Sequence, residues 1–563
     1  MNAQQLLTHF DHIADAPDAI PRLRRFILDL AVRGKLVPQD PNNEPASELL
    51  KRIATEKARW VKSEKIRKSK PLPPVTEDPY ELPFNWLWTR IREVTSDRGQ
   101  TVPDSPFTYI DVTAIDKEAG CIAEAKSLYA HEAPSRARKL IRKGDVIYSC
   151  VRPYLLNIAV VDEDLKPEPI ASTAFAVLNG FGLVLARYQW IVLRSPFIVG
   201  IVEASMRGQA YPAINDSDFA LLPFPLPPLA EQHRIVAKVD ELMALCDRLE
   251  AARMKREAAR DRMTTANLAR LNAPDPDLAT FQNHAAFVLN NLTPLTSRPD
   301  QIKALRQTIL NLAIRGKLVP QDTNDEPASE LLKHKKISVP DAGSFELPKS
   351  WAWVNVGAVA DSRLGKMLDK AKNKGTPRKY LRNINVRWFD FDLSNLLEMQ
   401  FEDLELPEFT LQDGDVLICE GGEPGRAAVW DNRRTDIYFQ KAIHRVRFLD
   451  FVDSEFFVKA LRASADDGRL AEYFTGTGIK HFTGKGLARY IFPLPPLAEQ
   501  HRIVAKVDEL MTLCNQVEAN LTTDDETRGR LVEAMLNEAL LTDTPVQERI
   551  SADIPAISVI RNA

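Results

Sequence analysis

The feature that most constrains this chain is a twenty-residue stretch that occurs twice without a change. FPLPPLAEQHRIVAKVDELM spans residues 224–243 and returns at 492–511, 268 positions further on. A second pair of blocks, 24–50 and 306–332, is identical at 21 of 27 positions. Such repeats predict two copies of one architectural unit, so the fold must place like blocks around two unlike segments.

Weaker echoes occur in the same order between these blocks. ELPFNWLW at residues 81–88 corresponds to ELPKSWAW at 346–353, and RKGDVIYSC corresponds to LQDGDVLIC. Each half is therefore expected to run helix, variable domain, helix. The expected parts are an N-terminal helical region (1–70), a first variable domain (71–228), a central helical region (229–340), a second variable domain (341–496) and a C-terminal helix and tail (497–563).

The repeated blocks are expected to form long helices. After the prolines of PLPP no further proline occurs before Pro274, which leaves room for a helix of about 40 residues. Apolar residues in both copies step by four and three, a pattern typical of helices that pack together. These positions are Ile235, Val239, Leu242, Cys246 and Leu249 in the first copy, and Ile503, Val507, Leu510, Cys514 and Val517 in the second.

Two arrangements of the long helices fit this pattern. We expect them to pair as an antiparallel coiled coil about a pseudo-twofold axis, because identical helices within one chain favour such symmetry. The alternative is two separate amphipathic helices, each covering its own domain. The RGKLVPQ blocks are expected to end their helices at Gly34 and Gly316, where glycine can adopt a left-handed cap.

The variable segments have the pattern of strands. Short runs such as DVIYSCV, AFAVL, DVLIC and HRVRFL alternate or are β-branched, and Gly, Asp, Asn and Pro bound them. Each variable segment is therefore predicted to be a mixed α/β domain. The fold class of the whole chain is α+β.

Composition predicts a soluble, multi-domain protein. A chain of 563 residues is too long for one core, and it has no apolar run of about 18 residues. The first residues lack a secretory signal, so a cytoplasmic location is expected. The five cysteines include no CxxC pair, and no nucleotide-binding loop, HExxH or GxSxG motif occurs. We therefore expect neither a metal centre nor a catalytic centre.

Two basic stretches stand out against a net charge of −3. Residues 51–70 hold nine basic and two acidic side chains, which fits a solvated helix or linker. Residues 363–387 hold nine basic side chains and one acidic, interleaved with Gly, Tyr and Asn, a mixture suited to nucleic acid. Two unlike domains held by like helices would suit a duplex with two different half-sites around a spacer.

The chain resembles the specificity (S) subunit of type I restriction–modification systems. The features that carry the resemblance are the duplication, the PLPPLAEQHRIVAKVDELM blocks, the RGKLVPQD blocks and the GDV signals. The resemblance implies that each variable domain is a target recognition domain for one half of a split DNA site. It implies that the helices dock two modification (M) subunits and that restriction (R) subunits join the complex, in a host-defence system based on DNA methylation.

The same resemblance implies that this subunit is not an enzyme and binds no cofactor. S-adenosylmethionine, ATP and Mg²⁺ would be used by the other subunits, and no membrane would be involved. The rival interpretation is a stand-alone bipartite DNA-binding regulator or a coiled-coil scaffold.

Candidate DNA-binding residues come from the basic stretch and from two loops. TGTGIKHFT resembles the glycine-rich loop that family members present to DNA, and MRGQAYPAIN is its counterpart in the first half. The first-domain candidates are Arg136, Arg138, Ser149, Arg152, Tyr154, Arg207, Gln209, Tyr211 and Asn215. The second-domain candidates are Arg363, Lys366, Lys372, Lys374, Arg378, Arg382, Asn383, Thr477, Lys480 and His481.

Overall fold

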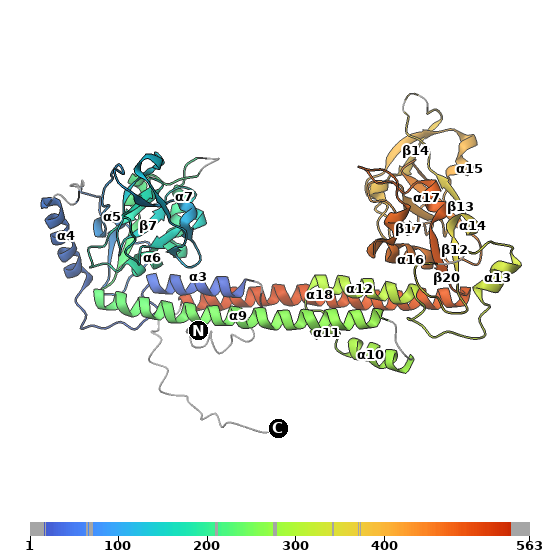
Figure 1. Cartoon of the computed structure of the whole chain (residues 1–563), viewed down its shortest axis with the longest axis horizontal. Helices are drawn as coiled ribbons and strands as arrows, with labels where there is room; N and C mark the ends of the chain where they lie inside the picture. Colours follow the sequence, from blue (N-terminus) through green and yellow to red (C-terminus); the bar gives the residue numbers. More distant parts are fainter. Residues whose placement is uncertain are drawn as a thin grey trace, which may run out of the picture. The chain divides into compact units, whose positions relative to one another are not determined.

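The computed structural model describes residues 16, 18–63, 66, 71–208, 212–273, 278–340, 343–369, 371 and 373–541. The chain divides into two compact units, which are labelled by element in Figure 1. Unit 1 comprises residues up to Arg256 together with those from Asp525 onward, and unit 2 comprises Glu257–Asp524. Each unit combines a sheet-containing domain with helices of the repeated blocks.

Unit 1 opens with two helices and then builds its domain between β1 and β11. Its helices are α3 (Ala19–Val32), α4 (Ala46–Lys62), α5 (Ile91–Val94), α6 (Ala186–Arg194), α7 (Pro196–Ser205), α8 (Asp216–Ala220) and the first part of α9 (Leu229–Asn272). Its strands are β1 (Leu87–Arg90), β2 (Phe107–Ile110), β3 (Ile115–Asp116), β4 (Cys121–Ile122), β5 (Lys126–Leu128), β6 (Ala137–Leu140), β7 (Val146–Ser149), β8 (Ile158–Val160), β9 (Pro169–Ser172), β10 (Phe175–Leu178) and β11 (Pro223–Leu226).

Unit 2 repeats this order after the end of α9. Its helices are α10 (Leu278–Asn290), α11 (Leu292–Leu295), α12 (Pro299–Ile314), α13 (Ala328–His334), α14 (Val356–Val359), α15 (Leu406–Phe409), α16 (Ser454–Asp466), α17 (Gly484–Arg489) and most of α18 (Leu497–Leu541). Its strands are β12 (Ala352–Asn355), β13 (Ala360–Leu364), β14 (Thr376–Leu381), β15 (Leu397–Phe401), β16 (Val416–Cys419), β17 (Ala427–Val429), β18 (Ile437–Phe439), β19 (Ile443–Phe448) and β20 (Ile491–Leu494).

The two domains share their strand pairing. In unit 1, β1 pairs antiparallel with β11, β10–β7–β8 form one sheet, and β2 runs parallel to β9 within β5–β2–β9–β6. In unit 2, β12 pairs with β20, β19–β16–β17 lie in one sheet, and β14 runs parallel to β18 beside β15. The strand runs expected from the sequence are confirmed, and the FPL of the exact repeat is the last strand of each domain.

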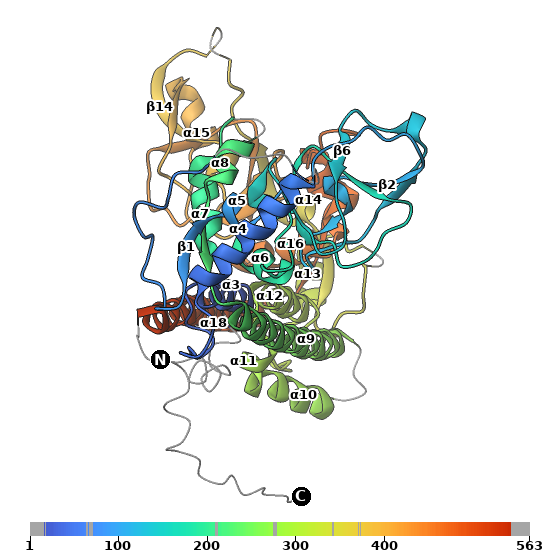
Figure 2. The ribbon, with the colours of Figure 1, turned by 90° about the vertical axis from the view of Figure 1, so that its left-hand side faces the viewer.

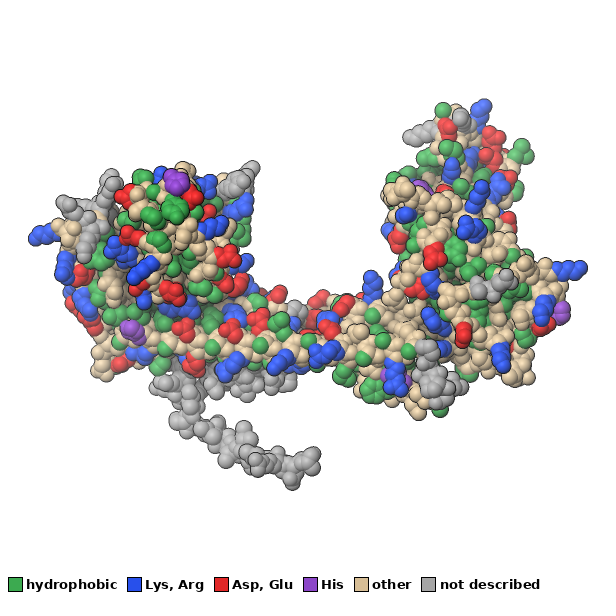
Figure 3. Space-filling view, viewed as in Figure 1, with side chains coloured by type: hydrophobic (Ala, Val, Ile, Leu, Met, Phe, Trp, Pro, Cys, Tyr) green, Lys and Arg blue, Asp and Glu red, His purple; other side chains and the backbone are tan. Residues whose placement is uncertain are grey.

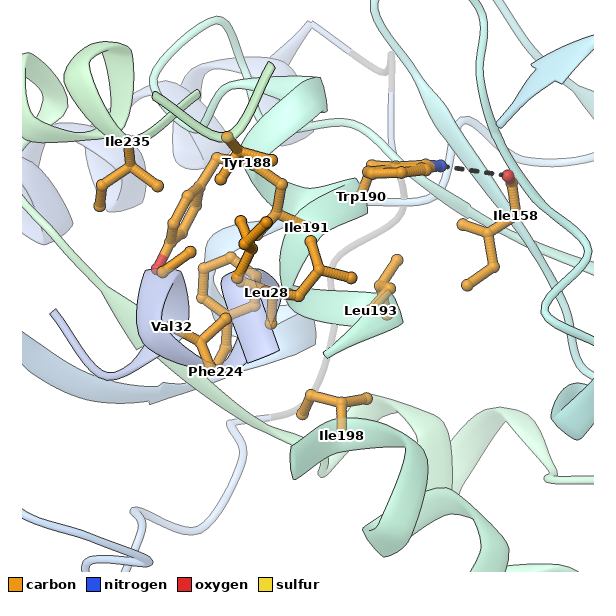
Figure 4. Packing of buried hydrophobic residues seen from close by; sticks show 14 of the residues in the cluster. Leu28, Val32, Ile158, Tyr188, Trp190, Ile191, Leu193, Ile198, Phe224 and Ile235 are labelled. Carbon is orange, nitrogen blue, oxygen red and sulfur yellow. Dashed lines mark hydrogen bonds between the residues drawn. The ribbon is translucent and has the colours of Figure 1, made fainter. Parts of the chain in front are cut away.

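A continuous core joins the domain of unit 1 to its helices. Tyr188 and Ile191 of α6, Phe224 of β11 and Ile235 of α9 pack in one buried cluster with Leu28 of α3 (Figure 4). The Trp190 indole N–H, at the far side of this cluster, donates to the carbonyl of Ile158 at 3.3 Å. The variable domain and the repeated helix therefore share apolar surface and fold together.

Helix α4 covers the outer side of the unit 1 domain beside α5, as Figure 2 shows with unit 1 facing the viewer. Lys57 reaches the C-terminal end of α5, where its ammonium donates to the Arg92 carbonyl at 2.6 Å, and burial lowers its pKa to about 8. Lys51, Arg52 and Arg59 form surface ion pairs with glutamates. The described part of the 51–70 stretch is thus a helix with paired charges.

The apolar series of each long helix packs within its own unit. Ile235, Val239, Leu242 and Cys246 lie in a cluster with α3, which Val532 and Met535 of α18 also join. Ile503, Val507 and Cys514 lie in a different cluster, with α12, and Leu268 of α9 packs against it. Each series therefore packs against the short helix of its own repeat, and the pairing of the two long helices stays a prediction.

Matching ion pairs accompany this packing. Arg24 of α3 contacts Asp247 and Glu250 of α9 at 2.7 and 2.9 Å, and Arg306 of α12 contacts Glu518 of α18 at 2.7 Å. In each unit the short helix therefore runs antiparallel to the long one. Within the described ranges, no helix is long and apolar enough to cross a membrane.

The three repeated sequence blocks meet at one buried carboxylate in each unit. In unit 2, Glu499 of the LAEQ motif accepts a hydrogen bond from the indole N–H of Trp351 at 3.0 Å and another from the Gln321 amide. In unit 1, Glu231 accepts from Gln39 at 2.6 Å, and Trp86 occupies the place corresponding to Trp351. Both carboxylates are almost fully buried. We call each set of Glu, Gln and Trp a junction.

The glycine that ends each short helix lies in close contact with its junction. Gly34 and Gly316 have φ of +69° and +67°, which confirms the expected left-handed caps. A Cβ on Gly316 would lie 2.4 Å from the Pro348 ring and 3.2 Å from the Trp351 ring, and Gly34 meets Pro83 and Trp86 in the same way. Only glycine satisfies both the backbone angle and the close approach.

The glutamine of each LAEQ motif ties the long helix to its domain. The Gln232 side chain accepts from the Leu185 amide at 2.9 Å, at the start of α6, and donates to the Pro227 carbonyl. Gln500 accepts from the Asp453 amide at 2.7 Å, at the start of α16, and donates to the Phe451 carbonyl. The repeat is exact here because each glutamine makes corresponding hydrogen bonds in both units.

The junctions predict a specific pH dependence of stability. Burial raises the pKa of Glu231 and Glu499 above the ordinary value of 4.5, against the opposing effect of their hydrogen bonds. Between 4.5 and the raised value the folded chain holds more protons than the unfolded chain, so the free energy of unfolding falls as pH rises through that window. We expect the Glu231→Gln/Glu499→Gln variant to show a flatter pH dependence in urea unfolding between pH 4 and 8. Parallel curves for the native chain and the variant would contradict this.

Candidate nucleic-acid interface

Two loops lie side by side at the end of the β7 strand in unit 1. The loop 207–213 is closed by reciprocal backbone hydrogen bonds of 3.0 Å between Arg207 and Ala213. The loop after β7 contacts it directly, because the Arg152 amide donates to the Pro212 carbonyl at 2.7 Å. Arg207 and Tyr154 are exposed on this surface, and Arg207 also pairs with Asp218 at 3.1 Å.

Unit 2 has the same pair of loops after β16. Thr475 and His481 exchange backbone hydrogen bonds of 2.9 Å and close the loop 475–481. The next amide, of Phe482, donates to the Glu420 carbonyl at 2.8 Å, and the His481 ring lies over Gly421. Thr477, Lys480 and His481 are all exposed. The three residues predicted from the loop TGTGIKHFT therefore lie on one exposed surface.

The two loops correspond position by position. Arg207 and Ala213 lie 268 residues before Thr475 and His481, the same offset as the exact repeat. Asn215 then caps α8, its side chain accepting from the Asp218 amide at 2.8 Å, and Thr483 caps α17 in the same place. The backbone frame is therefore shared, while the residues at corresponding positions of the two loops differ in sequence.

Three of the nine basic residues in the 363–387 stretch of unit 2 form ion pairs with a nearby acidic segment. Arg363 pairs with Glu408, Lys366 with Glu405, and Arg378 with Asp403 at 3.5 Å. Lys366 is buried, and its ammonium holds the pKa of Glu405 below the ordinary value. Figure 3 shows blue and red side chains intermingled at the β14 end of this domain. The stretch is therefore not one open basic surface, whereas Lys374 is exposed.

Asn383 lies against the loop after β16, and Arg382 is bonded to the segment before β15. The Asn383 amide donates to the Gly421 carbonyl at 3.2 Å, and its own carbonyl accepts from Arg426 at 2.7 Å. The Arg382 guanidinium donates to the Asn395 carbonyl at 3.0 Å. Both residues hold the loop region in shape, and Asn383 adjoins the exposed loop surface.

The remaining unit 1 candidates are spread more widely. Ser149 is buried and donates to the Val151 carbonyl at 2.8 Å, and the Asn215 side chain is engaged in its helix cap. Arg136 is exposed at the start of β6, and Arg138 lies on that strand with its guanidinium donating to Ala137. The structure does not bring these two arginines together with the loop pair by any direct contact among the residues described. Gln209, Tyr211 and Lys372 lie outside the described residues.

A charged cluster beside the unit 2 loops was not predicted. Glu423 accepts from the Trp388 indole at 3.3 Å and pairs with Arg426 at 2.6 Å. These residues follow β16 in the segment EGGEPGR, where Gly422 and Gly425 have φ of +83° and +88°. The density of glycines directly after a predicted strand is the signal that could have located this loop.

The two loop surfaces offer hydrogen-bond donors and acceptors on a rigid frame, but not a reactive centre. Cationic and hydroxyl groups can contact phosphates, and imidazole, amide and carboxylate groups can contact base edges. In the part of the chain that the structure describes, no three His, Cys, Asp or Glu side chains gather as a metal site.

Comparisons with known proteins agree with this arrangement. A family model described as the type I restriction modification DNA specificity domain matches residues 186–258 and 348–524. The specificity subunit of the type I restriction enzyme EcoAI from Escherichia coli is 31% identical, over 92% of this chain and 94% of its own length. The EcoEI specificity subunit, also from Escherichia coli, is 30% identical with the same coverage. A solved chain from work on complex assembly and conformational transition of the type I R-M system is 26% identical, covers 83% of this chain and 100% of its own, and has a TM-score of 0.50.

Proposed function

Since the chain belongs to the family of type I restriction enzyme specificity subunits, we propose that it reads a split duplex DNA site, one half with each recognition domain. As a member of that family it is a DNA sequence-specificity subunit and is not catalytic. The proposed recognition domains are residues 71–228 and 341–496.

One observation carries this proposal. Each domain presents a loop closed by the same backbone bridge at the same place, Arg207 to Ala213 and Thr475 to His481, while the exposed residues differ. Matched frames with different side chains are what two half-sites of different sequence require. The proposed readers are Arg152, Tyr154, Arg207, Gln209 and Tyr211 in the first domain, and Thr477 and His481 in the second, while Lys480 of the same loop is proposed to contact phosphate and Asn383 to support the loop.

We assign the remaining candidates either to contacts with the phosphate backbone or to shaping the surface of the domain. Lys374 is the strongest of these because it is exposed in the residues described, and Arg136, Arg138 and Lys372 are proposed to act in the same way. Arg363, Lys366, Arg378 and Arg382 are already bonded within the domain, so we assign them to shaping its surface.

The helices are proposed to assemble the complex by binding the partner subunits. The long helices would pair antiparallel, related by a pseudo-twofold axis, and dock two modification subunits, to which restriction subunits add. S-adenosylmethionine, ATP and Mg²⁺ would be used by those partners and not by this chain, and the complex would work in the cytoplasm. The matching contacts of α3 with α9 and of α12 with α18 support two equivalent docking sites.

Selection of bound duplexes from a random library tests the proposed function. The full chain with its modification subunit should enrich two short blocks of fixed sequence separated by a constant number of unspecified base pairs. A single uninterrupted block, or no enrichment beyond general affinity for DNA, would contradict it.

Exposed lysines should contribute general affinity with a clear salt signature. We expect Lys374→Ala or Lys480→Ala to weaken binding to all duplexes and to reduce the slope of log affinity against log salt by about 0.9 each. Lys333→Ala on α13 is the matched control, because Lys333 is also exposed but lies outside both loop surfaces. Fluorescence anisotropy at several salt concentrations measures this, and an unchanged slope for the double variant would exclude these contacts.

A further inference from the structure

The junctions join segments that are far apart in the chain. Glu499 begins the long helix, Gln321 follows the short helix, and Trp351 precedes the first strand of the domain. Glu231, Gln39 and Trp86 have the same places in unit 1. In unit 2 one carboxylate therefore holds the entry of the recognition domain, the exit from it and the end of the short helix together, and in unit 1 Glu231 binds Gln39 with Trp86 beside it.

A buried carboxylate is energetically unfavourable at this position. Its presence therefore indicates that its directional hydrogen bonds matter. Burying its charge is unfavourable, and apolar residues of similar size often stabilise such sites better. A carboxylate can accept from two donors at once, however, here the indole N–H and the glutamine amide of unit 2. Two directional bonds fix an angle, whereas apolar packing alone tolerates small rotations.

The angle fixed here matters because a small tilt moves the far side of a domain by a distance comparable to one base pair. A domain of this size is roughly 35–40 Å across. A tilt of about 5° at its base would move its far side by about 3.4 Å, which is the rise of one base pair. The ties of Gln232 to α6 and Gln500 to α16 oppose the same tilt.

We propose that Glu231 and Glu499, with their Gln and Trp partners, are positioning residues that fix the angle of each recognition domain on its long helix and so restrict the DNA spacer length that the chain accepts. This inference rests on the proposed reading of a split site. The exact repetition of the LAEQ motif then serves spacer discrimination as well as folding.

The test measures spacer discrimination separately from half-site binding. The full chain with its modification subunit is titrated with the selected target, with targets whose spacer is one base pair longer or shorter, and with duplexes holding one intact half-site. We expect Glu499→Ala and Glu231→Ala each to reduce the penalty for a wrong spacer at least threefold, with half-site affinity unchanged within about twofold. Trp351→Phe keeps an aromatic ring but removes the indole N–H. It should reduce the penalty for a wrong spacer in the same direction, but more weakly.

Glu509→Ala and Glu241→Ala are matched controls, because both glutamates are exposed on the same long helices and pair only with a lysine one turn away. Both should keep the native penalty. An unchanged penalty in the junction variants overturns the inference, and so does a loss of half-site affinity as large as the loss of spacer discrimination. A native chain that ignores spacer length overturns the proposed function and this inference with it, so the two failures are distinguishable.

Discussion

Val507→Asp is expected to leave unit 2 unable to fold and to abolish both DNA binding and assembly with partner subunits. Val507 is buried in a cluster with Ile503 of its own helix and Ile309 of α12. An unpaired carboxylate in such a site costs roughly 3–5 kcal/mol, a large part of the 5–15 kcal/mol that stabilises a typical domain. Val239→Asp should have the same effect on unit 1, where Val239 is equally buried.

Circular dichroism, urea unfolding and size-exclusion chromatography with the modification subunit measure this outcome. Ala505→Asp is the matched control, because Ala505 is exposed on the same helix two residues away. It should fold and assemble like the native chain. A Val507→Asp variant that does the same would show that the cluster between α12 and α18 is wrongly assigned.

Gly316→Ala is expected to destabilise unit 2 by roughly 2–5 kcal/mol, since it combines two unfavourable terms. A left-handed backbone costs an L-residue about 1–2 kcal/mol, and the overlap of its Cβ with Pro348 adds about 1–3 kcal/mol. Gly414→Ala isolates the first term, because Gly414 has φ of +81° but no atom within 4 Å of its Cβ position. We expect it to lose only about 1–2 kcal/mol.

Urea unfolding of the two alanine variants separates these terms. Equal destabilisation at both glycines would mean that the close approach of Pro348 and Trp351 contributes nothing. A larger loss at Gly316 would show that the junction is tightly packed, as its role in holding the recognition domain requires.

The helices and strands were predictable because their signals are local. The proline-free run after PLPP gave the extent of α9, Gly34 and Gly316 marked the ends of α3 and α12, and DVLIC gave β16. The partner of the apolar series was not predictable. A four-three pattern shows that a helix packs against something, but not whether that is the other long helix or the short helix of its own repeat.

The candidate DNA-binding surface was predictable only in part. The loop TGTGIKHFT was located correctly as an exposed loop, because glycine-rich segments between strand and helix signals lie on surfaces. The ion pairs of Arg363, Lys366 and Arg378 with Glu408, Glu405 and Asp403 were not predictable, since they join segments about 25 to 45 residues apart in the chain. Asn215 could have been recognised as a cap from its place before DSD.

The contacts that the repeated residues make in the structure explain why the repeat is exact. Asp240 pairs with Arg187 of α6 at 3.0 Å, and its twin Asp508 pairs with Lys459 of α16 at 3.0 Å. Together with the junction glutamates and the Gln232 and Gln500 ties, these contacts attach each recognition domain to its helix in the same way. The repeated residues therefore form the same attachment in both units, for two domains that are proposed to recognise different DNA half-sites.

Methylation-aware sequencing of DNA modified by the complete complex tests the central claim most directly. The account predicts modified bases within a motif of two short specified blocks separated by a spacer of constant length. It also predicts that exchanging the 475–481 loop for that of a relative changes one block and leaves the other intact. An uninterrupted motif, a spacer of variable length, or changes in both blocks on exchanging one loop would contradict it.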